Sequence, residues 1–270
     1  MTGERENWDR TKLERSLRFA KASDELIREI VLHIEKDLHD GMRTVDIYEH
    51  AFNLLKKYHR PAAAEYSIKR AILQLGPSGF PFERFVAHIL EAQGYSTRVG
   101  VMVSGVCVTH EVDVVAEKKD ERILVEAKFH NSASIKSDVK VALYVHARFQ
   151  DIQKRLDLEE QTERYTHAWL ITNTEFTSQA IQYGSCVGLA MTGWNYPKGH
   201  TLQDLIQATQ THPVTCMTTL SDKQKIDLLN HGTVLVREVV DDSSRLAKIG
   251  IGKQQIASIV SEGKALFKAA

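Results

Sequence analysis

Two apolar segments separated by a short charged turn constrain the fold of this chain most. One runs from His110 to Ala116 and the other from Arg122 to Phe129, and both are rich in β-branched and aliphatic residues. Segments of this length bounded by polar residues predict buried strands. Because the turn between them, Lys118 to Glu121, is short, we expect the two strands to form an antiparallel hairpin.

Three of the charged residues in this hairpin form a candidate site. Asp113 lies inside the first strand, and Glu126 and Lys128 lie in the second. Alternate side chains of a strand share a face, so Glu126 and Lys128 lie together and pairing can bring Asp113 beside them. A carboxylate among apolar neighbours is costly unless it is paired or metal-bound. The cluster predicts an oxygen site for a hard divalent cation, Mg²⁺ or Mn²⁺; an exposed strand with an ordinary glutamate–lysine pair is the alternative.

The order acid, acid, any residue, lysine resembles the active-site pattern of the PD-(D/E)xK nucleases. Val112 stands where the first letter of that pattern has proline. The segment Phe82 to Tyr95 resembles the first helix of the Mrr-like restriction endonuclease branch, with the form F-E-x-x-V-A-x-x-L-x-x-x-G-Y. Ala168 to Asn173 resembles the fourth strand of that branch. The resemblance covers residues 77–200 and implies an α/β core with a mixed sheet.

The resemblance also implies roles for particular residues. Asp113 and Glu126 correspond to the metal ligands, Lys128 to the catalytic lysine, and Glu83 to the helix acid that supports the site. The implied reaction is hydrolysis of a phosphodiester bond in DNA. The metal would activate water and stabilise charge on the phosphate, and the lysine would position the nucleophile.

Composition places few further limits on function. The chain has 270 residues, of which 43% are hydrophobic and 26% charged, and its formal net charge is zero. A DNA enzyme with this balance needs its positive charge placed locally. The three cysteines are far apart and form no CxxC pair, which favours a reducing compartment. We find no signal peptide and no run near the ~20 apolar residues of a membrane helix, so we expect a cytoplasmic protein without membrane contact.

A long helix is expected from about Asp138 to Leu156. Its basic residues could contact the DNA backbone, but for each one we favour a solvated helix face. These residues are Lys140, Arg148, Lys154 and Arg155. His146 on this helix and His167 beyond it are interpreted as structural, because the 12 histidines of the chain show no ligand spacing.

Residues 1–75 show helical periodicity. Ser23 is expected to cap one helix, Gly41 to end it, and Pro61 to break a later one. A small helical bundle without chemistry would account for this pattern. The Leu75 to Gly79 stretch contains two glycines and a proline and predicts a domain boundary.

The N-terminal pattern also resembles the ATP-cone, a nucleotide-sensing domain. The matching residues are Gly3, Glu4, Trp8, Asp9, Lys12, Leu13, Ser16 and Leu17, then Gly41, Met42, Arg43, Thr44 and Ile47, then Ala64, Tyr66 and Arg70. Met1 falls where the basic first strand of that family would end. The resemblance implies ATP or dATP as an effector, with Lys12 as a nucleotide contact. An alternative is that this segment serves only to form a homo-oligomer.

Asn195 to Gly199 predicts a second boundary, after which residues 201–270 are helical in pattern. Two stretches with glycine between short helices resemble a tandem helix-hairpin-helix. In the second stretch, Gly250 and Gly252 would let the backbone approach a DNA phosphate, and Lys253 would add positive charge. A helical cap that uses glycines only as helix stops is the alternative.

The sequence therefore predicts a multidomain α and α/β protein. Its parts are a cone-like helical domain (1–75), a restriction-endonuclease-like core (77–200) and a helical DNA-contact module (201–270). The favoured function is a Mg²⁺-dependent DNA endonuclease that ATP or dATP regulates. The competing hypothesis is a non-catalytic, nucleotide-responsive DNA-binding regulator built on a nuclease scaffold.

Overall fold

The computed structural model describes residues 6–159 and 164–268. Internal contacts divide the chain into two compact units. Unit 1 combines Met1–Ile72 with His212–Ala270, and unit 2 is Leu73–Thr211. This division differs from the three predicted modules, because both terminal segments belong to unit 1. Residues 201–211, which we assigned to the C-terminal module, lie in unit 2.

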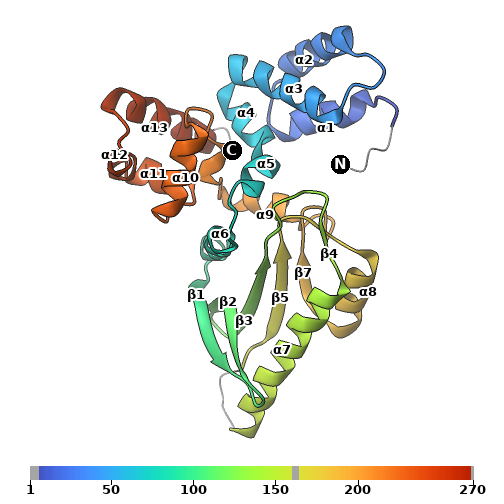
Figure 1. The fold of residues 1–270 in the computed structure, drawn as a ribbon, viewed down its shortest axis with the longest axis vertical. Coiled ribbons are helices and arrows are strands. Elements are labelled where there is room, and N and C mark those ends of the chain that lie inside the picture. Colours follow the sequence, from blue (N-terminus) through green and yellow to red (C-terminus); the bar gives the residue numbers. More distant parts are fainter. Residues whose placement is uncertain (1–5, 160–163, 269–270) are drawn as a thin grey trace. The chain divides into compact units, whose positions relative to one another are not determined.

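Unit 2 is an α/β domain (Figure 1). Its elements are α6 (Phe80–Ala92), β1 (Ser96–Ser104), β2 (Thr109–Lys118), β3 (Glu121–Lys128), β4 (Lys136–Ser137), α7 (Val139–Leu158), β5 (His167–Thr172), β6 (Glu175–Phe176), α8 (Ser178–Val187), β7 (Ala190–Thr192) and α9 (Leu202–Thr209). The predicted hairpin is present as β2 and β3.

The main sheet of unit 2 has the strand order β1-β2-β3-β5-β7. β1, β2 and β3 pair antiparallel, whereas β5 pairs parallel to both β3 and β7. The sheet is therefore mixed, as predicted. A parallel pair needs a long crossover, and the connection from β3 to β5 contains the twenty-residue helix α7.

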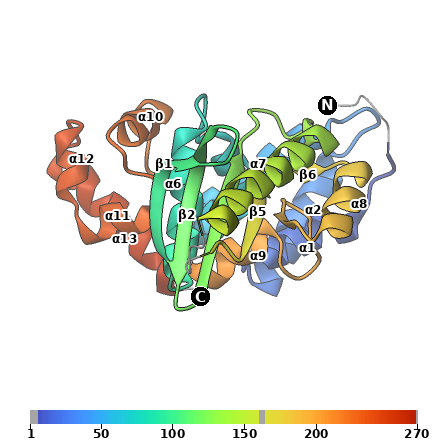
Figure 2. The same cartoon turned by 90° about the horizontal axis from the view of Figure 1, so that it is seen from below.

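Helix α7 runs along the sheet over β5 (Figures 1 and 2). Asp138 caps it by accepting hydrogen bonds from the backbone N–H groups of Lys140 and Val141. Its residues Ala142, Val145 and Ile152 are buried. α6 packs against β1, β2 and β3 and buries its apolar side chains. The two helices thus border the hairpin that carries the predicted site.

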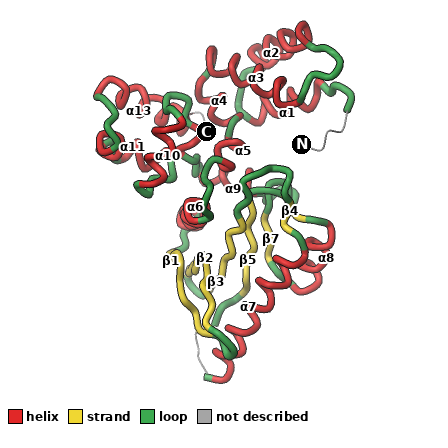
Figure 3. The backbone as a smooth tube through the Cα atoms, in the orientation of Figure 1, coloured by secondary structure: helices red, strands yellow, loops and turns green. Residues whose placement is uncertain are grey.

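Unit 1 consists of helices joined by loops in the described part of the chain (Figure 3). Its elements are α1 (Arg10–Phe19), α2 (Asp24–Asp37), α3 (Thr44–Tyr58), α4 (Arg60–Tyr66), α5 (Ile68–Leu73, reaching the boundary with unit 2), the 3₁₀ helix η1 (Val214–Cys216), α10 (Asp222–Asn230), α11 (Val236–Asp241), α12 (Ser244–Lys248) and α13 (Lys253–Lys268). Ser23 caps α2 as predicted, but α2 ends at Asp37, before Gly41.

Two apolar clusters form the core of unit 1. One belongs to α1 to α4 and includes Leu17, Ile30 and Leu55, all fully buried. The other combines the C-terminal helices with Ala64 and Ala71 from α4 and α5. The second cluster explains why the two ends of the chain form one unit. No helix in the described ranges is both long and apolar enough to cross a bilayer.

Candidate active site on the β2–β3 hairpin

The three predicted residues of the hairpin lie where the strand pairing ends. The register of β2 and β3 pairs Val114 with Val125, so Asp113 and Glu126 are the next residues on neighbouring strands. Beyond the last paired residues, the Asp113 side chain continues the hydrogen bonding between the two strands. The backbone N–H of Ala127 donates to Asp113 Oδ2 at 2.7 Å. This hydrogen bond fixes the position of the carboxylate.

Asp113 is partly buried beside other acids. Burial, followed by the neighbouring Glu126 carboxylate, raises the pKa of Asp113 from 3.8 to about 7. The backbone hydrogen bond from Ala127 and the positive charge of Arg148 act in the opposite direction but do not offset this rise. A negative charge at Asp113 is therefore under-compensated in the protein alone. Perturbed carboxyl groups of this kind are concentrated at functional sites.

Glu83 approaches the same acids from the first turn of α6. Burial, and then the negative charges of Glu111 and Glu126, raises the pKa of Glu83. Within the described residues, however, Glu83, Asp113 and Glu126 do not bring one oxygen each to within 4.8 Å of one another. Glu83 is thus electrostatically coupled to the acids of the hairpin without forming a tight three-carboxylate cluster with them.

Lys128 lies on β3 next to Thr172 of β5 in the parallel register. Its side chain is half-buried, and within the described ranges it forms no ion pair. Its charge, together with burial, lowers the pKa of His130. An ammonium group without a carboxylate partner is free to contact an incoming anion such as a phosphate.

Arg148 was wrongly predicted to lie on a solvated face of the long helix. Its side chain is only 11% exposed, and its Nη1 donates to Glu126 Oε2 at 2.5 Å. It also donates to the Tyr144 hydroxyl and stacks on that ring. Burial alone would lower the pKa of Arg148, but Glu126 and Tyr144 outweigh it and raise that pKa. Helical periodicity could not identify this residue, because its acidic partner is on another element.

A polar network supports the loop that follows Lys128. The backbone N–H of His130 donates to Asn173 Oδ1, and Asn173 Nδ2 donates to the His130 carbonyl, both at 2.8 Å. His130 Nε2 lies 2.9 Å from Ser137 Oγ, which donates to Thr172 Oγ1. Ser137, Thr172 and Asn173 are buried. The network fixes the ends of β3 and β5 beside the candidate site.

Lys12 lies at a cavity of about 530 Å³ in unit 1. Most of the described residues that resemble the ATP-cone line this cavity. They are Trp8, Asp9, Lys12, Leu13, Ser16, Gly41, Met42, Thr44, Ile47 and Tyr66. Gly3 and Glu4 of that pattern lie outside the described residues. Three separate stretches of the predicted pattern thus converge on one cavity.

The cavity has a mixed electrostatic character. Lys12 Nζ forms an ion pair with Glu6 Oε2 at 2.7 Å, and a hydrogen bond from Lys12 to Glu6 raises the lysine pKa. Asp9 and Asp40 add negative charge to the lining. The Trp8 indole nitrogen is buried and has no hydrogen-bond acceptor among the described residues. The lining therefore offers one lysine, whose present partner a ligand phosphate would have to replace.

Gly250 and Gly252 lie between α12 and α13, and Lys253 is the first residue of α13. Gly250 has φ +81°, a left-handed conformation that favours glycine. A Cβ atom at Gly250 or Gly252 would meet no atom within 4 Å, so the backbone there is open to a ligand. Gly232 has φ +76° and separates α10 from α11 in the same way. The two helix–glycine–helix hairpins are present, but nothing in their geometry identifies a bound phosphate.

Two family models match the chain. A model described as a restriction endonuclease matches residues 76–191, and a model described as AF1548-like, C-terminal, matches residues 212–267. The first match contains the β2–β3 hairpin and all four residues of the candidate site. It confirms the predicted resemblance of the central segment to restriction endonucleases and indicates nuclease activity. The resemblances of the N-terminal part to an ATP-cone and of the C-terminal part to a helix-hairpin-helix stay predictions.

Two relatives match this chain over 98% or more of their own length. An uncharacterized protein from Archaeoglobus fulgidus is 35% identical over 181 residues, which are 66% of this chain and 98% of the relative. A solved structure, described as the protein of unknown function AF1548, is 32% identical with a TM-score of 0.58. That comparison covers 72% of this chain and 100% of the solved chain.

Proposed function

The chain belongs to the AF1548-like family and carries a restriction endonuclease domain, and we propose that it is a divalent-metal-dependent DNA endonuclease. The proposal rests mainly on one arrangement. Asp113 and Glu126 lie on neighbouring strands at the end of their pairing, with Lys128 two residues further along β3. The matched restriction endonuclease segment contains all three residues.

The residues of this site fit a divalent metal ion. Burial, followed by the Glu126 charge, raises the pKa of Asp113 to about 7, so a positive charge beside Asp113 would stabilise its ionised form. Asp113 and Glu126 would hold the ion through oxygen, as Mg²⁺ and Mn²⁺ prefer. When bound, the ion would polarise the phosphodiester and offset the charge that develops on it.

The other residues orient groups in this proposal. Ala127 N–H holds the Asp113 carboxylate, and Arg148 holds the Glu126 carboxylate. Lys128 contacts the scissile phosphate or positions the attacking water, because its ammonium group is not neutralised by an ion pair in the described residues. Glu83 supports the acids from α6 and is coupled to them by charge.

DNA is the proposed substrate, and the C-terminal hairpin is a proposed backbone contact. The exposed backbone at Gly250 and Gly252 precedes the first turn of α13, and the N–H groups of a first helical turn have no acceptor within the helix. Backbone N–H groups at a helix start and the charge of Lys253 bind phosphate without reading sequence. This contact would hold DNA without selecting a sequence.

ATP or dATP is proposed as an effector in the cavity beside Lys12. Support comes from the convergence of the cone-like pattern on a cavity of about 530 Å³. Thermal unfolding of the full-length protein with ATP or dATP would test the effector. We expect stabilisation that Lys12→Ala removes and that Lys36→Ala, an exposed lysine on α2, retains.

Cleavage of supercoiled and methylated plasmid in Mg²⁺ and Mn²⁺ tests the nuclease itself. We expect metal-dependent nicking that Asp113→Ala and Lys128→Ala abolish, while DNA retardation by Lys128→Ala persists. Asp120→Ala, an exposed acid in the turn of the same hairpin, should cleave like wild type. If Lys128→Ala loses DNA binding with its fold intact, the assigned role of Lys128 is wrong.

The competing function is a non-catalytic DNA-binding regulator on the same scaffold. The complete acid–acid–lysine set at the hairpin argues against it, because a protein that only binds DNA does not need all three groups. Absence of cleavage in every metal, with DNA retardation preserved and responsive to ATP or dATP, would favour the regulator.

A further inference from the structure

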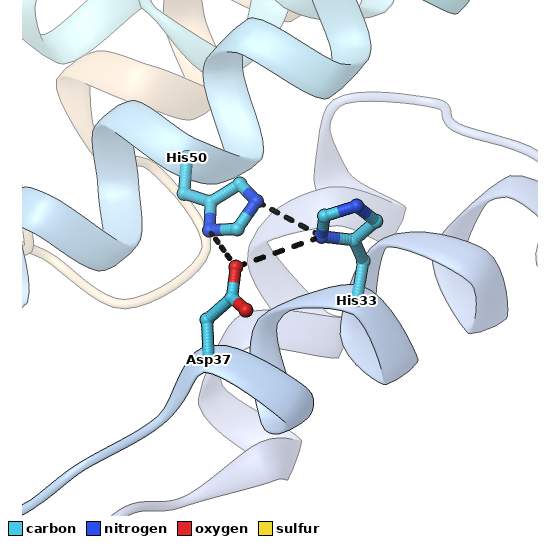
Figure 4. Close-up of side chains that lie close together, drawn as sticks. All are labelled: His33, Asp37 and His50. Carbon is cyan, nitrogen blue, oxygen red and sulfur yellow. Dashed lines mark hydrogen bonds and ion pairs between the residues drawn. The ribbon is translucent and has the colours of Figure 1, made fainter.

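Two histidines and an aspartate of unit 1 lie close together (Figure 4). His33 and Asp37 lie on α2 and His50 lies on α3. One possible metal-ligand atom from each residue lies within 4.8 Å of the other two. Among the described residues, this is the group of three His, Cys, Asp or Glu side chains that meets this condition. The side chains point toward one another.

The ligand atoms of the three residues lie close enough to share a metal ion after rotation of the side chains. His50 Nε2 lies 3.1 Å from His33 Nδ1. Asp37 Oδ2 lies 3.9 Å from His33 Nδ1 and 3.7 Å from His50 Nδ1. A tetrahedral ion with ligand bonds of roughly 2.0–2.1 Å places its ligand atoms about 3.3 Å apart. An ion would bind only one of the two His50 nitrogens, and one ligand atom from each residue lies within 4.8 Å of the other two. Rotation of the side chains would bring the three atoms around one ion.

The contacts of the metal-free cluster leave it incompletely satisfied. The two ring nitrogens at 3.1 Å face each other, so one of them must donate and the other accept. Asp37 Oδ2 stays beyond ordinary hydrogen-bond distance of both rings. One ion at the centre would accept electron pairs from both rings and from the carboxylate at the same time.

The ligand types select the metal. Two imidazoles and one carboxylate suit Zn²⁺, Co²⁺ or Ni²⁺, whereas Mg²⁺ prefers oxygen ligands alone. Three protein ligands leave the fourth tetrahedral position to water. The side chains of His33 and Asp37 are 57% and 55% exposed, so an ion has access to the cluster from solvent.

The cluster joins two elements. His33 and Asp37 are four residues apart on α2 and therefore share a face, while His50 lies on α3 after the loop that connects the two helices. Leu38, His39, Asp40, Gly41 and Met42 of this loop line the cavity beside Lys12. An ion bound by the cluster would cross-link α2 to α3 at the start of that loop.

We propose that His33, Asp37 and His50 form a Zn²⁺-binding site that cross-links α2 and α3. The site is separate from the nuclease site and differs from it in ligand chemistry. The buried face of α2 uses other residues, namely Ile27, Ile30, Val31 and Ile34. Substitutions at the exposed cluster therefore leave the core of unit 1 intact.

The test is Zn²⁺ titration by calorimetry of the full-length, untagged protein. All proteins carry Asp113→Ala as a background substitution, because it removes a proposed metal ligand of the nuclease site. We expect one Zn²⁺ per chain. His33→Ala and His50→Ala should each weaken the affinity by more than about tenfold. Co²⁺ in place of Zn²⁺ should give visible absorption that both substitutions remove, and Zn²⁺ should raise Tm only when all three ligands are present.

Two controls distinguish this site from nonspecific binding of Zn²⁺ to exposed histidines. His231→Ala, an exposed histidine next to α10, should bind Zn²⁺ as the background protein does. Mg²⁺ at the same concentration should neither bind nor raise Tm. The proposal is overturned if the background protein binds no Zn²⁺. It is also overturned if His33→Ala and His50→Ala bind Zn²⁺ as tightly as His231→Ala does.

Discussion

Asp113 is placed where its charge is costly to the fold and useful to the proposed reaction. Its pKa of about 7 lies above the value of 3.8 for an ordinary aspartate, chiefly because of burial. The folded protein therefore holds the proton on Asp113 more tightly than the unfolded chain does. The stability from this group is fully present below about pH 4 and is lost as the pH rises through 7.

Asp113→Asn should consequently stabilise the metal-free protein at high pH. Asparagine resembles the neutral acid and can still accept the hydrogen bond from Ala127. We expect the free energy of unfolding at pH 8 in EDTA to rise by about 1–3 kcal/mol, with a smaller gain at pH 5. Urea unfolding at both pH values measures this gain. An equal gain at pH 5 and pH 8 would contradict the raised pKa.

The positive charge of Arg148 affects the pKa of Asp113. Its positive charge lowers the pKa of Asp113, so removal of that charge should raise this pKa further. For Arg148→Met we expect the acid limb of the pH–rate profile of plasmid cleavage to move up by at most about one pH unit. Tyr144→Phe removes the other partner of Arg148 and keeps the Glu126 ion pair, so its profile should stay in place. An unmoved profile in Arg148→Met would refute the positioning role.

At the scale of elements, α7 does more than cover the sheet. Asp151 on α7 reaches the turn between β1 and β2, where its carboxylate accepts from the backbone N–H groups of Cys107 and Val108. His110 Nε2 lies 2.8 Å from the same carboxylate. A Cβ atom at Gly105 would collide with Asp151, so the turn requires glycine there. The hydrogen bond from His110, followed by that from Cys107, holds the pKa of Asp151 well below its usual range.

Asp151→Ala should therefore destabilise unit 2 in a pH-dependent way. A depressed pKa means that the stability from Asp151 is present above about pH 4 and is lost as the pH falls further. We expect wild type to have a higher Tm than Asp151→Ala at pH 7, and we expect the difference in Tm to be much smaller at pH 3. Asp157→Ala, an exposed acid on the same helix, serves as the control. A difference in Tm of the same size at both pH values would rule out this explanation.

At the scale of the whole molecule, unit 1 is assembled from both ends of the chain. His212 Nε2 and Glu65 Oε1 lie 2.7 Å apart, with side-chain exposures of 1% and 4%. Thr215 Oγ1 donates to the Ala71 carbonyl, which adds a second buried link. The apolar cluster of the C-terminal helices includes Ala64 and Ala71. The N-terminal helices therefore depend on the last quarter of the chain.

His212→Ala should destabilise unit 1, because Glu65 would stay buried without this partner. We expect a loss of about 2–4 kcal/mol in the free energy of unfolding of that unit. Urea unfolding followed by circular dichroism measures it. His231→Ala, an exposed histidine of the same unit, should cost far less. Similar losses in the two variants would show that the buried pair does not join the segments.

Features that depend on local patterns could be predicted from the sequence. The strands β2 and β3 and the long helix α7 follow from periodicity and turn residues over short distances, and α6 follows from the resemblance to the restriction endonuclease branch. The approach of Asp113 to Glu126 could be predicted because the two residues lie on adjacent strands joined by a short turn. The same local reasoning misplaced the end of α2, since Gly41 adopts a left-handed conformation inside the following loop instead of ending the helix.

Features that depend on partners far apart in sequence could not be predicted from local patterns. Arg148 meets Glu126 across 22 residues, and His212 meets Glu65 across 147. His33 and Asp37 meet His50 only because α2 packs against α3. Periodicity shows which face of an element is apolar, but it does not show which element covers that face. The packing of the whole chain determines which elements are neighbours. It therefore also determines which charges surround each candidate site.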